Sequence, residues 1–422
     1  MTLAALELND QSLLIQADDG TLHAESGFAR LTPDGIITGE DAHAVAWREP
    51  QHVYNQYWCH LNQAPLAASQ RLARHHGDIA FAQLRGLWHS VGAPESLMVA
   101  APGSFSDEQL SLLLGMIEAL PASAVAIVDS ALAACLPEER ETLFVDMHLH
   151  QSVLSLCRPQ GGELRIVAQE VIPDLGMLQV HNTVARHISH LLIDSFRFDP
   201  LHASASEQSI HDRIPAWLTR LRWDDEVADT LASEQGELPF ILRRDDIQAL
   251  VGERLVNLRS FVNRHPGCRL LLAHASGPLA GLAAEFSEAD VAGQSAAAEH
   301  CLSHHPLILE QAEGVYRITA LRLGTSLGPA VENDQQLATH LLSGDRALPL
   351  RRPVSIRIGD DGVQLIEGID ADAALTVVLR NRSLEAVHRA NGTEAVLPRE
   401  CRPGEAVVVG GHQLKLIEVQ DG

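Results

Sequence analysis

The chain has 422 residues, and its 55 acidic side chains outnumber its 31 Lys and Arg side chains, which gives a formal net charge of −24 at pH 7. A protein that binds nucleic acid through its phosphates needs a basic face, so the composition argues against a nucleic-acid partner. The only lysine is Lys415, which excludes any mechanism that needs an earlier lysine. The length and the 46% of apolar residues predict a globular protein of two or three domains.

Membrane insertion and export are not expected. No apolar run approaches the roughly 18 residues that cross a bilayer, and the first residues lack a basic leader segment. The six cysteines form no CxxC pair, so we expect reduced thiols rather than disulfides or a zinc knuckle. The sequence therefore predicts a cytoplasmic protein that is not inserted in a membrane.

The first part of the chain is expected to mix short strands with helices. A turn signal, Asp18-Asp19-Gly20, separates two of the early strands. Ser106 is a plausible N-cap with Gln109 three residues later, which is typical of a capping box at the start of a helix. The expected elements are strands 3–8, 12–16, 21–24, 97–101 and 124–128, a helix over 78–88, a helix from residue 106, and a short helix over 129–134.

Longer helices follow a second group of strands. The expected elements are strands 142–146, 152–157, 163–169 and 268–273, and helices 175–196, 207–222, 244–264 and 276–286. From about residue 352, short strands alternate with Gly-rich turns, which predicts a small all-β domain. The segments 323–329 and 332–334 resemble a linker in composition.

Four segments resemble the heat-shock chaperone branch of the actin-like ATPases. Residues 98–109, MVAAPGSFSDEQ, are similar to the strand, V-P-A-x-F and D-x-Q helix start of that family. Residues 129–134, DSALAA, resemble its E-P-x-A-A-A segment, with Asp for Glu and Ser for Pro. Weaker counterparts are residues 292–297, similar to a small-residue helix, and 240–250, similar to an arginine-led helix.

The resemblance implies an α/β fold of two lobes, the duplicated ribonuclease H-like fold that actin, sugar kinases and heat-shock chaperones share. Lobe I is expected over 1–140 and lobe II over 141–325. A linker over 326–350 and a small β-sandwich-like domain over 351–422 complete the expected organisation.

In this family, glycines in two hairpins let backbone N–H groups approach the nucleotide phosphates, because any Cβ would occupy that space. The first hairpin corresponds here to 7–12, ELNDQS, and the second, D-x-G-G-G-T in the family, to 146–152, DMHLHQS. The third element, a strand with G-G-S, corresponds to 272–278, LAHASGP. The glycines of the two hairpins and the paired glycines of the third element are missing, and the lysines that the chaperone branch uses are absent before residue 415.

These departures predict a pseudo-ATPase that needs no cofactor. The resemblance places its degenerate nucleotide cleft at Asn9, Asp10, Gln11, Ser12, His148, His150, Ala273, His274 and Ser276. The alternative is a divergent ATPase with weak activity that binds ATP and Mg²⁺, in which Asp146 and Asp129 hold a metal-bound water. A further alternative is a metal-binding protein, because His148, His150 and His274 would face one cleft and imidazole is a common transition-metal ligand.

Two interpretations of the C-terminal β-domain remain open. The segment 342–353 fits a shortened chaperone substrate-binding domain, although the chain is too short for a helical lid. The segment 397–419 resembles the end of a forkhead-associated sandwich, although the G-R and S-x-x-H signals of that family are missing. Both are binding modules, so the expected function is a non-catalytic scaffold with a protein partner.

Overall fold

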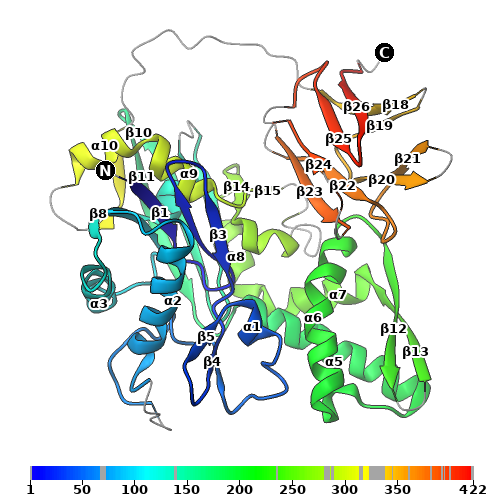
Figure 1. Ribbon diagram of the computed structural model, residues 1–422, viewed down its shortest axis with the longest axis horizontal. Helices are drawn as coiled ribbons and strands as arrows, with labels where there is room; N and C mark the ends of the chain where they lie inside the picture. The colour runs from blue at the N-terminus through cyan, green and yellow to red at the C-terminus, as the bar shows by residue number, and fades with distance from the viewer. Residues whose placement is uncertain are drawn as a thin grey trace. The chain divides into compact units, whose positions relative to one another are not determined.

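The computed structural model consists of two compact units. The large unit comprises Met1–Leu218 and Glu226–Thr325, and the β unit comprises Thr219–Asp225 and Ser326–Gly422 (Figure 1). The large unit is mixed α/β and the β unit is rich in strands, as the sequence predicted. The structure describes residues 2–66, 73–136, 140–233, 236–279, 286, 289–312, 317–322, 338–344, 346–359, 362–380, 383–390, 393, 395–398 and 401–419.

The large unit contains two six-stranded sheets in which five strands follow the same order. In sheet 1 three successive antiparallel strands are followed by parallel partners, in the order β16-β8-β7-β1-β2-β3. In sheet 2, with the order β15-β14-β9-β10-β11-β17, the first five strands repeat the pattern of β8-β7-β1-β2-β3, and the sixth strand, β17, pairs with β11 at the opposite edge from β16. The strands of sheet 1 are β1 (Leu3–Glu7), β2 (Leu13–Ala17), β3 (Leu22–Glu25), β7 (Ser96–Ala101), β8 (Ser123–Asp129) and β16 (Arg317–Ile318). Those of sheet 2 are β9 (Thr142–Met147), β10 (Ser152–Gln160), β11 (Glu163–Ile172), β14 (Arg269–Leu272), β15 (Asp290–Val291) and β17 (Ala320–Arg322).

Local sequence signals account for the elements that flank these strands. Every residue of β7 is buried, as expected for a parallel strand covered on both faces. Helix α3 (Asp107–Glu118) begins at the predicted capping box, in which Ser106 and Gln109 each hydrogen-bond to the other's backbone N–H. The helix α2 (His76–Ser90) and the strands of sheets 1 and 2 confirm the corresponding predictions to within a few residues.

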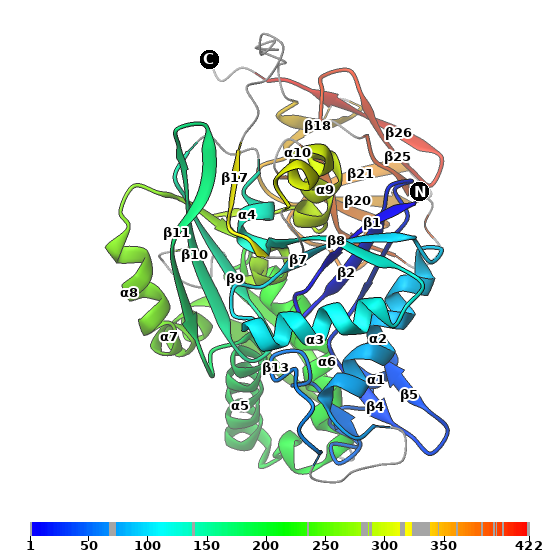
Figure 2. The same ribbon diagram turned by 90° about the vertical axis from the view of Figure 1, so that its left-hand side faces the viewer.

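Two helices of small residues pack between the sheets (Figure 2). Helix α4 (Ser130–Ala134) and helix α9 (Ala296–Ser303) contact each other, and their alanines let the backbones approach closely. The surrounding apolar cluster joins Met98 of sheet 1 with Phe144 of sheet 2. The two sheets of the large unit therefore share one core.

In each sheet, the chain leaves after the third strand and forms a further group of elements before it returns to the sheet. After β3 come the small sheet β5-β4-β6 and helix α1, with bounds β4 (Ala29–Leu31), β5 (Ile36–Thr38), α1 (Glu40–His43) and β6 (Val53–Tyr54). After β11 come α5 (Met177–Phe196), η1 (Pro200–His202), α6 (Ser204–Leu221), the hairpin β12 (Glu226–Ser233) and β13 (Gly236–Arg243), α7 (Arg244–Arg254) and α8 (Val256–Arg264). The single helix predicted over 244–264 is wrong, because Leu255 leaves helical geometry and separates α7 from α8.

Short helical segments follow the parallel strands β14 and β15 of sheet 2. A 3-10 helix, η2 (His274–Leu279), follows β14 where the sequence predicted a longer helix from residue 276. The rest of that prediction, 280–285, lies outside the described residues. Helix α10 (His305–Gln311) follows α9.

The β unit is a sandwich of two packed sheets. One sheet has the order β19-β18-β26-β25-β24 and the other β21-β20-β22-β23. Buried apolar residues from both sheets, such as Leu341 and Val354, form its core. The bounds are β18 (His340–Ser343), β19 (Arg346–Pro349), β20 (Val354–Gly359), β21 (Gly362–Glu367), β22 (Leu375–Arg380), β23 (Ser383–Arg389), β24 (Ala395–Val396), β25 (Ala406–Val409) and β26 (His412–Ile417).

This sandwich begins earlier than the sequence predicted. Strands β18 and β19 fall within 326–350, the range expected to be linker, because β18 pairs with the last strand β26 and completes its sheet. The linker-like segments 323–329 and 332–334 lie outside the described residues. None of the helices in the described part of the chain is long and apolar enough to cross a membrane.

Candidate functional site

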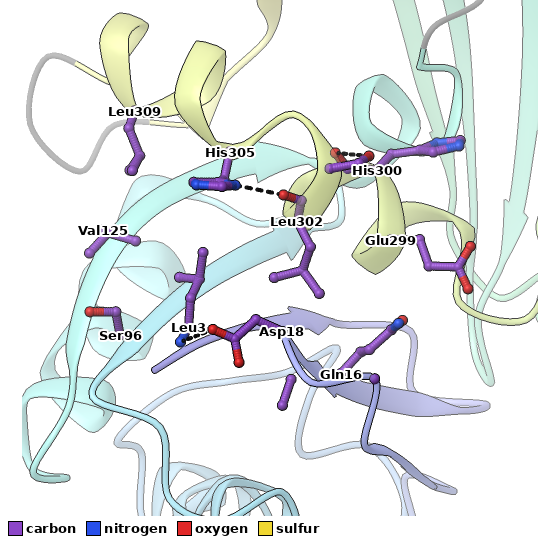
Figure 3. Close-up of a pocket in the computed structure, with 13 residues that line it drawn as sticks. Leu3, Gln16, Asp18, Ser96, Val125, Glu299, His300, Leu302, His305 and Leu309 are labelled. Atoms are coloured by element: carbon purple, nitrogen blue, oxygen red, sulfur yellow. Dashed lines mark hydrogen bonds between the residues drawn. The ribbon is translucent and has the colours of Figure 1, made fainter. Parts of the chain in front are cut away.

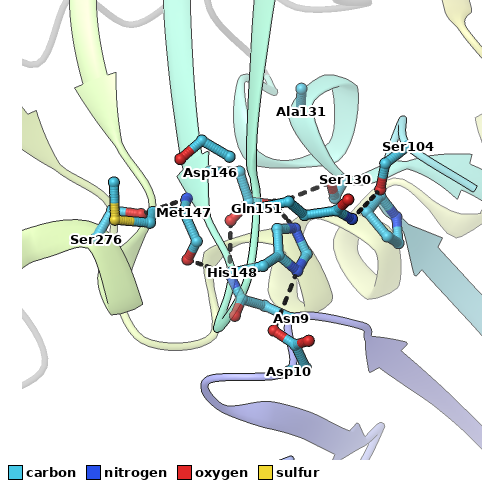
Figure 4. Close-up of polar contacts among 12 residues, drawn as sticks. Asn9, Asp10, Ser104, Ser130, Ala131, Asp146, Met147, His148, Gln151 and Ser276 are labelled. Atoms are coloured by element: carbon cyan, nitrogen blue, oxygen red, sulfur yellow. Dashed lines mark hydrogen bonds and ion pairs between the residues drawn. The ribbon is translucent and has the colours of Figure 1, made fainter. Parts of the chain in front are cut away.

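Two turns of the large unit meet where the first strands of the two sheets end. The turn after β1 carries Asn9, Asp10 and Gln11, and the turn after β9 carries His148 and Gln151 (Figure 4). Both turns lie in segments without glycine, 7–12 and 146–152. Polar side chains occupy the space between the two turns and contact one another directly.

Asn9 connects the two turns. Its side-chain N–H group donates to Asp146 Oδ1 at 2.7 Å and to the Met147 carbonyl at 3.2 Å. The Asn9 side-chain oxygen accepts the backbone N–H of Gln11 at 2.9 Å, and Gln11 Nε2 also donates to the Met147 carbonyl. Both the N–H group and the oxygen of the Asn9 amide are therefore hydrogen-bonded. The bonds to Asp146 and Met147 connect residues more than a hundred positions apart in the chain.

His148 lies between two carboxylates. Its Nε2 is 3.2 Å from Asp146 Oδ2, its Nδ1 is 3.6 Å from Asp10 Oδ1, and all three side chains are buried. Burial alone lowers the pKa of His148, but the charges of Asp146 and Asp10, both within ion-pair distance, raise the pKa to about 10. His148 is therefore an imidazolium at neutral pH, and it balances charge between the two turns.

Glu7 lies beneath this ion pair at the end of β1. Burial and the charge of Asp146 raise the pKa of Glu7 to about 8, against a smaller lowering by His148. Within the described residues, its buried Oε2 has no hydrogen-bond partner. Glu7 consequently carries a proton at neutral pH, which limits the negative charge in the interior.

Asp129 has a structural role at the end of β8. Its Oδ1 accepts the backbone N–H of Ala131 at 3.0 Å, which caps α4, and its Oδ2 accepts from Gln169 Nε2 at 3.3 Å. Burial raises the pKa of Asp129, and the hydrogen bond from Gln169 opposes that effect. Gly103 gives Gln169 its room, because a Cβ there would lie 1.9 Å from Gln169 Nε2.

The third element contributes a hydroxyl rather than a phosphate-binding loop. Ser276 of η2 is fully buried, and its Oγ accepts the backbone N–H of Met147 at 2.7 Å. Ala273 donates its backbone N–H to the Val145 carbonyl. Ser276 therefore supports the β9 turn from behind.

The N-terminus of α5 is also occupied by the turn after β9. The N–H groups of Met177 and Leu178 donate to the carbonyls of His148 and Leu149 at 2.8 and 3.0 Å. Free N–H groups at a helix N-terminus attract anions, but these two are already used. The fit is close, since a Cβ on Gly176 would lie 2.2 Å from the Leu149 carbonyl oxygen.

Little space remains beside the network. The cavity that reaches Asp10 and His148 has a volume of about 10 Å³, which is room for about one water molecule. Its other walls include Trp58 and Phe105. A nucleotide needs a site of several hundred Å³, so this cavity does not accommodate one.

A second contact spans the two inserted groups of elements. The ring of Trp47 stacks on His211 of α6 with centroids 3.8 Å apart, and His43 of α1 lies edge-on to Trp47 and to Phe28. Gln208 joins the same elements by accepting the Trp47 N–H at 3.0 Å and donating to the His43 carbonyl at 3.0 Å. We call Phe28, His43, Trp47 and His211 the aromatic clasp.

Two histidines at the aromatic clasp are neutral. Burial, followed by the charge of His43, lowers the pKa of His181 of α5 to about 4. Burial and the charges of His181 and His43 lower the pKa of His211 to about 3. A proton on either ring therefore disfavours the clasp.

The structure brings together some of the residues predicted for the site. Asn9, Asp10, Gln11, Asp146, His148 and Ser276 belong to the network, whereas His150 points elsewhere and contacts Asn55 at 3.1 Å. Ser12 contributes its backbone N–H to the Asn9 carbonyl. Among the described residues, no group of three or more His, Cys, Asp or Glu is placed to hold a metal ion, so His148, His150 and His274 do not form the centre that the metal hypothesis requires.

Sequence reasoning missed Gln169 and the aromatic clasp. Gln169 lies on β11 far from any motif, and Trp47 lies in a stretch without clear periodicity. No protein-family model matches the chain, and no curated protein matches it significantly. A function must therefore be inferred from the contacts within the molecule.

Proposed function

We propose that the large unit has the two-lobed actin-like fold and belongs to its heat-shock chaperone branch. The repeated strand order of sheets 1 and 2 supports this proposal, since duplication is the defining feature of that fold. The segments that carry the resemblance coincide with strands and helices of the large unit, which supports the proposal: 98–109 crosses from β7 into α3, 129–134 covers α4, and 292–297 leads into α9.

We further propose that the protein is a pseudo-ATPase, in which the two lobes are held together by side chains instead of by nucleotide. The observation that carries the proposal is the hydrogen bond of 2.7 Å from Asn9 to Asp146, made directly between the turn after β1 and the end of β9 in the two segments that would otherwise contact phosphate. His148 strengthens this contact by supplying a positive charge to Asp10 and Asp146. The buried imidazolium supplies, between the two carboxylates, the positive charge that a bound metal cation supplies in an ATPase.

The proposed role is that of a protein-binding scaffold. In the β unit, β18 pairs with β26, so the first and last strands of the sandwich are neighbours. This arrangement favours the forkhead-associated interpretation over the shortened chaperone domain. The partner would then bind to the β unit, and closure of the lobes would depend on protein contacts.

Calorimetric titration of the full chain with ATP and Mg²⁺ tests the pseudo-ATPase proposal. We expect no heat of binding at millimolar nucleotide, and no ATP turnover that disappears in Asp146→Ala. Binding in the wild type, weakened by Asp146→Ala and unchanged by the surface variant Asp34→Ala, would instead support the divergent ATPase. A partner screen with the full chain and with a chain that ends at residue 325 tests the scaffold role, and equal capture by both would contradict binding through the β unit.

A further inference from the structure

Two of the six free cysteines meet in the core of the large unit. Cys135 follows the last residue of α4, and Cys157 lies on β10 of sheet 2. Both contact one atom, because the carbonyl oxygen of Ala131 accepts the backbone N–H of Cys135 at 3.1 Å and the thiol of Cys157 at 3.6 Å. The two residues are 2% and 0% exposed, and they belong to the apolar cluster that joins the two sheets.

The electrostatic surroundings of Cys157 agree with a neighbouring thiol. The adjacent Cys135 side chain, followed by burial, raises the pKa of Cys157 well above its usual range. A high pKa keeps Cys157 in the thiol form, so the pair is reduced at rest. The other four cysteines differ from this pair, because burial and nearby acidic groups rather than a second thiol raise their pKa values: Cys59, Cys268, Cys301 and Cys401.

The pair lies where a helix anchored on sheet 1 touches sheet 2. Helix α4 follows β8 of sheet 1 directly, and Asp129 of β8 is its N-cap. The Ala133 carbonyl of α4 accepts from Nδ1 of His300 at 2.9 Å, and His300 projects from α9 at the wall of the cavity in Figure 3. Helix α9 in turn packs on β1 and β7 of sheet 1. Because Cys157 belongs to sheet 2, a bond between the two sulfurs would join the sheets covalently through α4.

We propose that Cys135 and Cys157 form an oxidation site, at which a peroxide converts the two thiols to a disulfide that fastens α4 to β10. One sulfur attacks a peroxide oxygen, the O–O bond breaks, and the released hydroxide takes the proton of that thiol, which gives a sulfenic acid and water. The other sulfur attacks the sulfenic sulfur. The S–S bond then forms as the S–O bond breaks, and the leaving hydroxide takes the second thiol proton and departs as water.

The test uses the full chain with Cys59→Ser and Cys268→Ser, because these two thiols are partly exposed and would react with peroxide independently. The protein is treated with millimolar hydrogen peroxide, quenched in acid, alkylated after unfolding and examined by mass spectrometry. We expect the loss of two hydrogens and of two alkylatable thiols, and a peptide that links Cys135 to Cys157 until it is reduced. The melting temperature should rise by about 5 °C, because the crosslink restricts the unfolded chain, and reduction should reverse the rise.

Cys301→Ala is the matched control, since Cys301 is buried in the same cluster and has no thiol neighbour; this variant should still form the link. Cys135→Ala and Cys157→Ala should each abolish the link and the rise in melting temperature, with tryptophan fluorescence as the check of folding. The peptide map of the parent chain decides the question even if one of these variants does not fold. A link through Cys301 or Cys401, no link after prolonged oxidation, or thiol loss that persists in Cys135→Ala overturns the proposal.

Discussion

Replacement of His148 by alanine is the most direct test of the polar network. The change removes a positive charge that lies 3.2 Å from Asp146 and 3.6 Å from Asp10, and it leaves two buried carboxylates unpaired. A pKa of about 10 for His148, against the ordinary 6.5, corresponds to about 5 kcal/mol of stabilisation. Breaking a buried ion pair costs about 3–5 kcal/mol. We therefore expect His148→Ala to lower the free energy of unfolding by about 4 kcal/mol at pH 6.

Urea unfolding followed by tryptophan fluorescence measures this loss, because four of the five tryptophans, Trp47, Trp58, Trp88 and Trp217, lie in the large unit. His150→Ala is the matched control. His150 lies on the same turn, and its hydrogen-bond partner is the neutral Asn55, so we expect a loss of about 1 kcal/mol. The triple variant Asp10→Asn, Asp146→Asn, His148→Ala should recover part of the stability, because it has no unpaired carboxylate at these positions.

The pH dependence gives a second test of the same residue. A histidine whose pKa is raised on folding contributes its full stability below pH 6.5, and the contribution disappears as the pH rises through 10. The difference between wild type and His148→Ala should therefore shrink between pH 7 and pH 10. A loss in His148→Ala no larger than in His150→Ala, or a difference that is constant over this range, would refute a charged His148 between the two aspartates.

Three further predictions concern neighbouring features. The carboxyl of Glu7 has a pKa of about 8 in the folded chain instead of 4.5, so its burial destabilises the protein increasingly as the pH rises above 4.5. Glu7→Gln should therefore stabilise the protein by about 3 kcal/mol at pH 7 and by nothing near pH 4. Equal effects at both pH values in chemical unfolding would contradict this. At the aromatic clasp, the lowered pKa values of His181 and His211 mean that stability is lost as the pH falls from 6.5 towards 4, so hydrogen-exchange protection of α6 should decrease at pH 5 in the wild type and less so in His211→Phe. Gly176→Ala should lower the melting temperature, since the new Cβ would lie 2.2 Å from the Leu149 oxygen, whereas Gly115→Ala on the open face of α3 should leave it unchanged or higher; similar shifts in both would show that the turn after β9 adapts freely.

The sequence predicted elements whose signals are local. The apolar run of β7 and the capping box at Ser106 each involve residues a few positions apart, and the structure has both. The hairpin of β12 and β13 lies outside the predicted elements, although Leu238, Phe240 and Leu242 alternate with exposed residues, because segment 240–250 resembles a helix and its first residues belong to β13. The break at Leu255 follows Gly252 in the last turn of α7, and a single Gly, which a helix can accommodate at a cost of about 1 kcal/mol, is a weak signal for a break.

The sequence could not predict the contacts of the candidate site. The missing glycines directed attention to the turns that contain Asn9 and His148, but the hydrogen bond from Asn9 to Asp146 depends on how two sheets pack across a separation of 137 residues. The metal hypothesis assumed that His148 and His150 share a face of an extended segment. Instead this segment is a turn, so His148 enters the interior while His150 reaches Asn55.

Two of the contacts between the halves of the large unit respond to pH in opposite directions. The network at His148 is strongest below pH 6.5 and weakens as the pH rises towards 10, and the carboxyl of Glu7 adds a cost in the same direction up to pH 8. The aromatic clasp is strongest above pH 6.5 and weakens as His181 and His211 take up protons at lower pH. Their sum is greatest near pH 6.5, so we expect closure of the large unit to be most stable near this pH and to weaken on both sides of it. Alkaline opening should begin at the turns after β1 and β9, and acid opening at α1 and α6. Hydrogen exchange measured on both sides of the maximum would distinguish these two starting points, and a single starting point on both sides would show that one contact alone holds the unit closed.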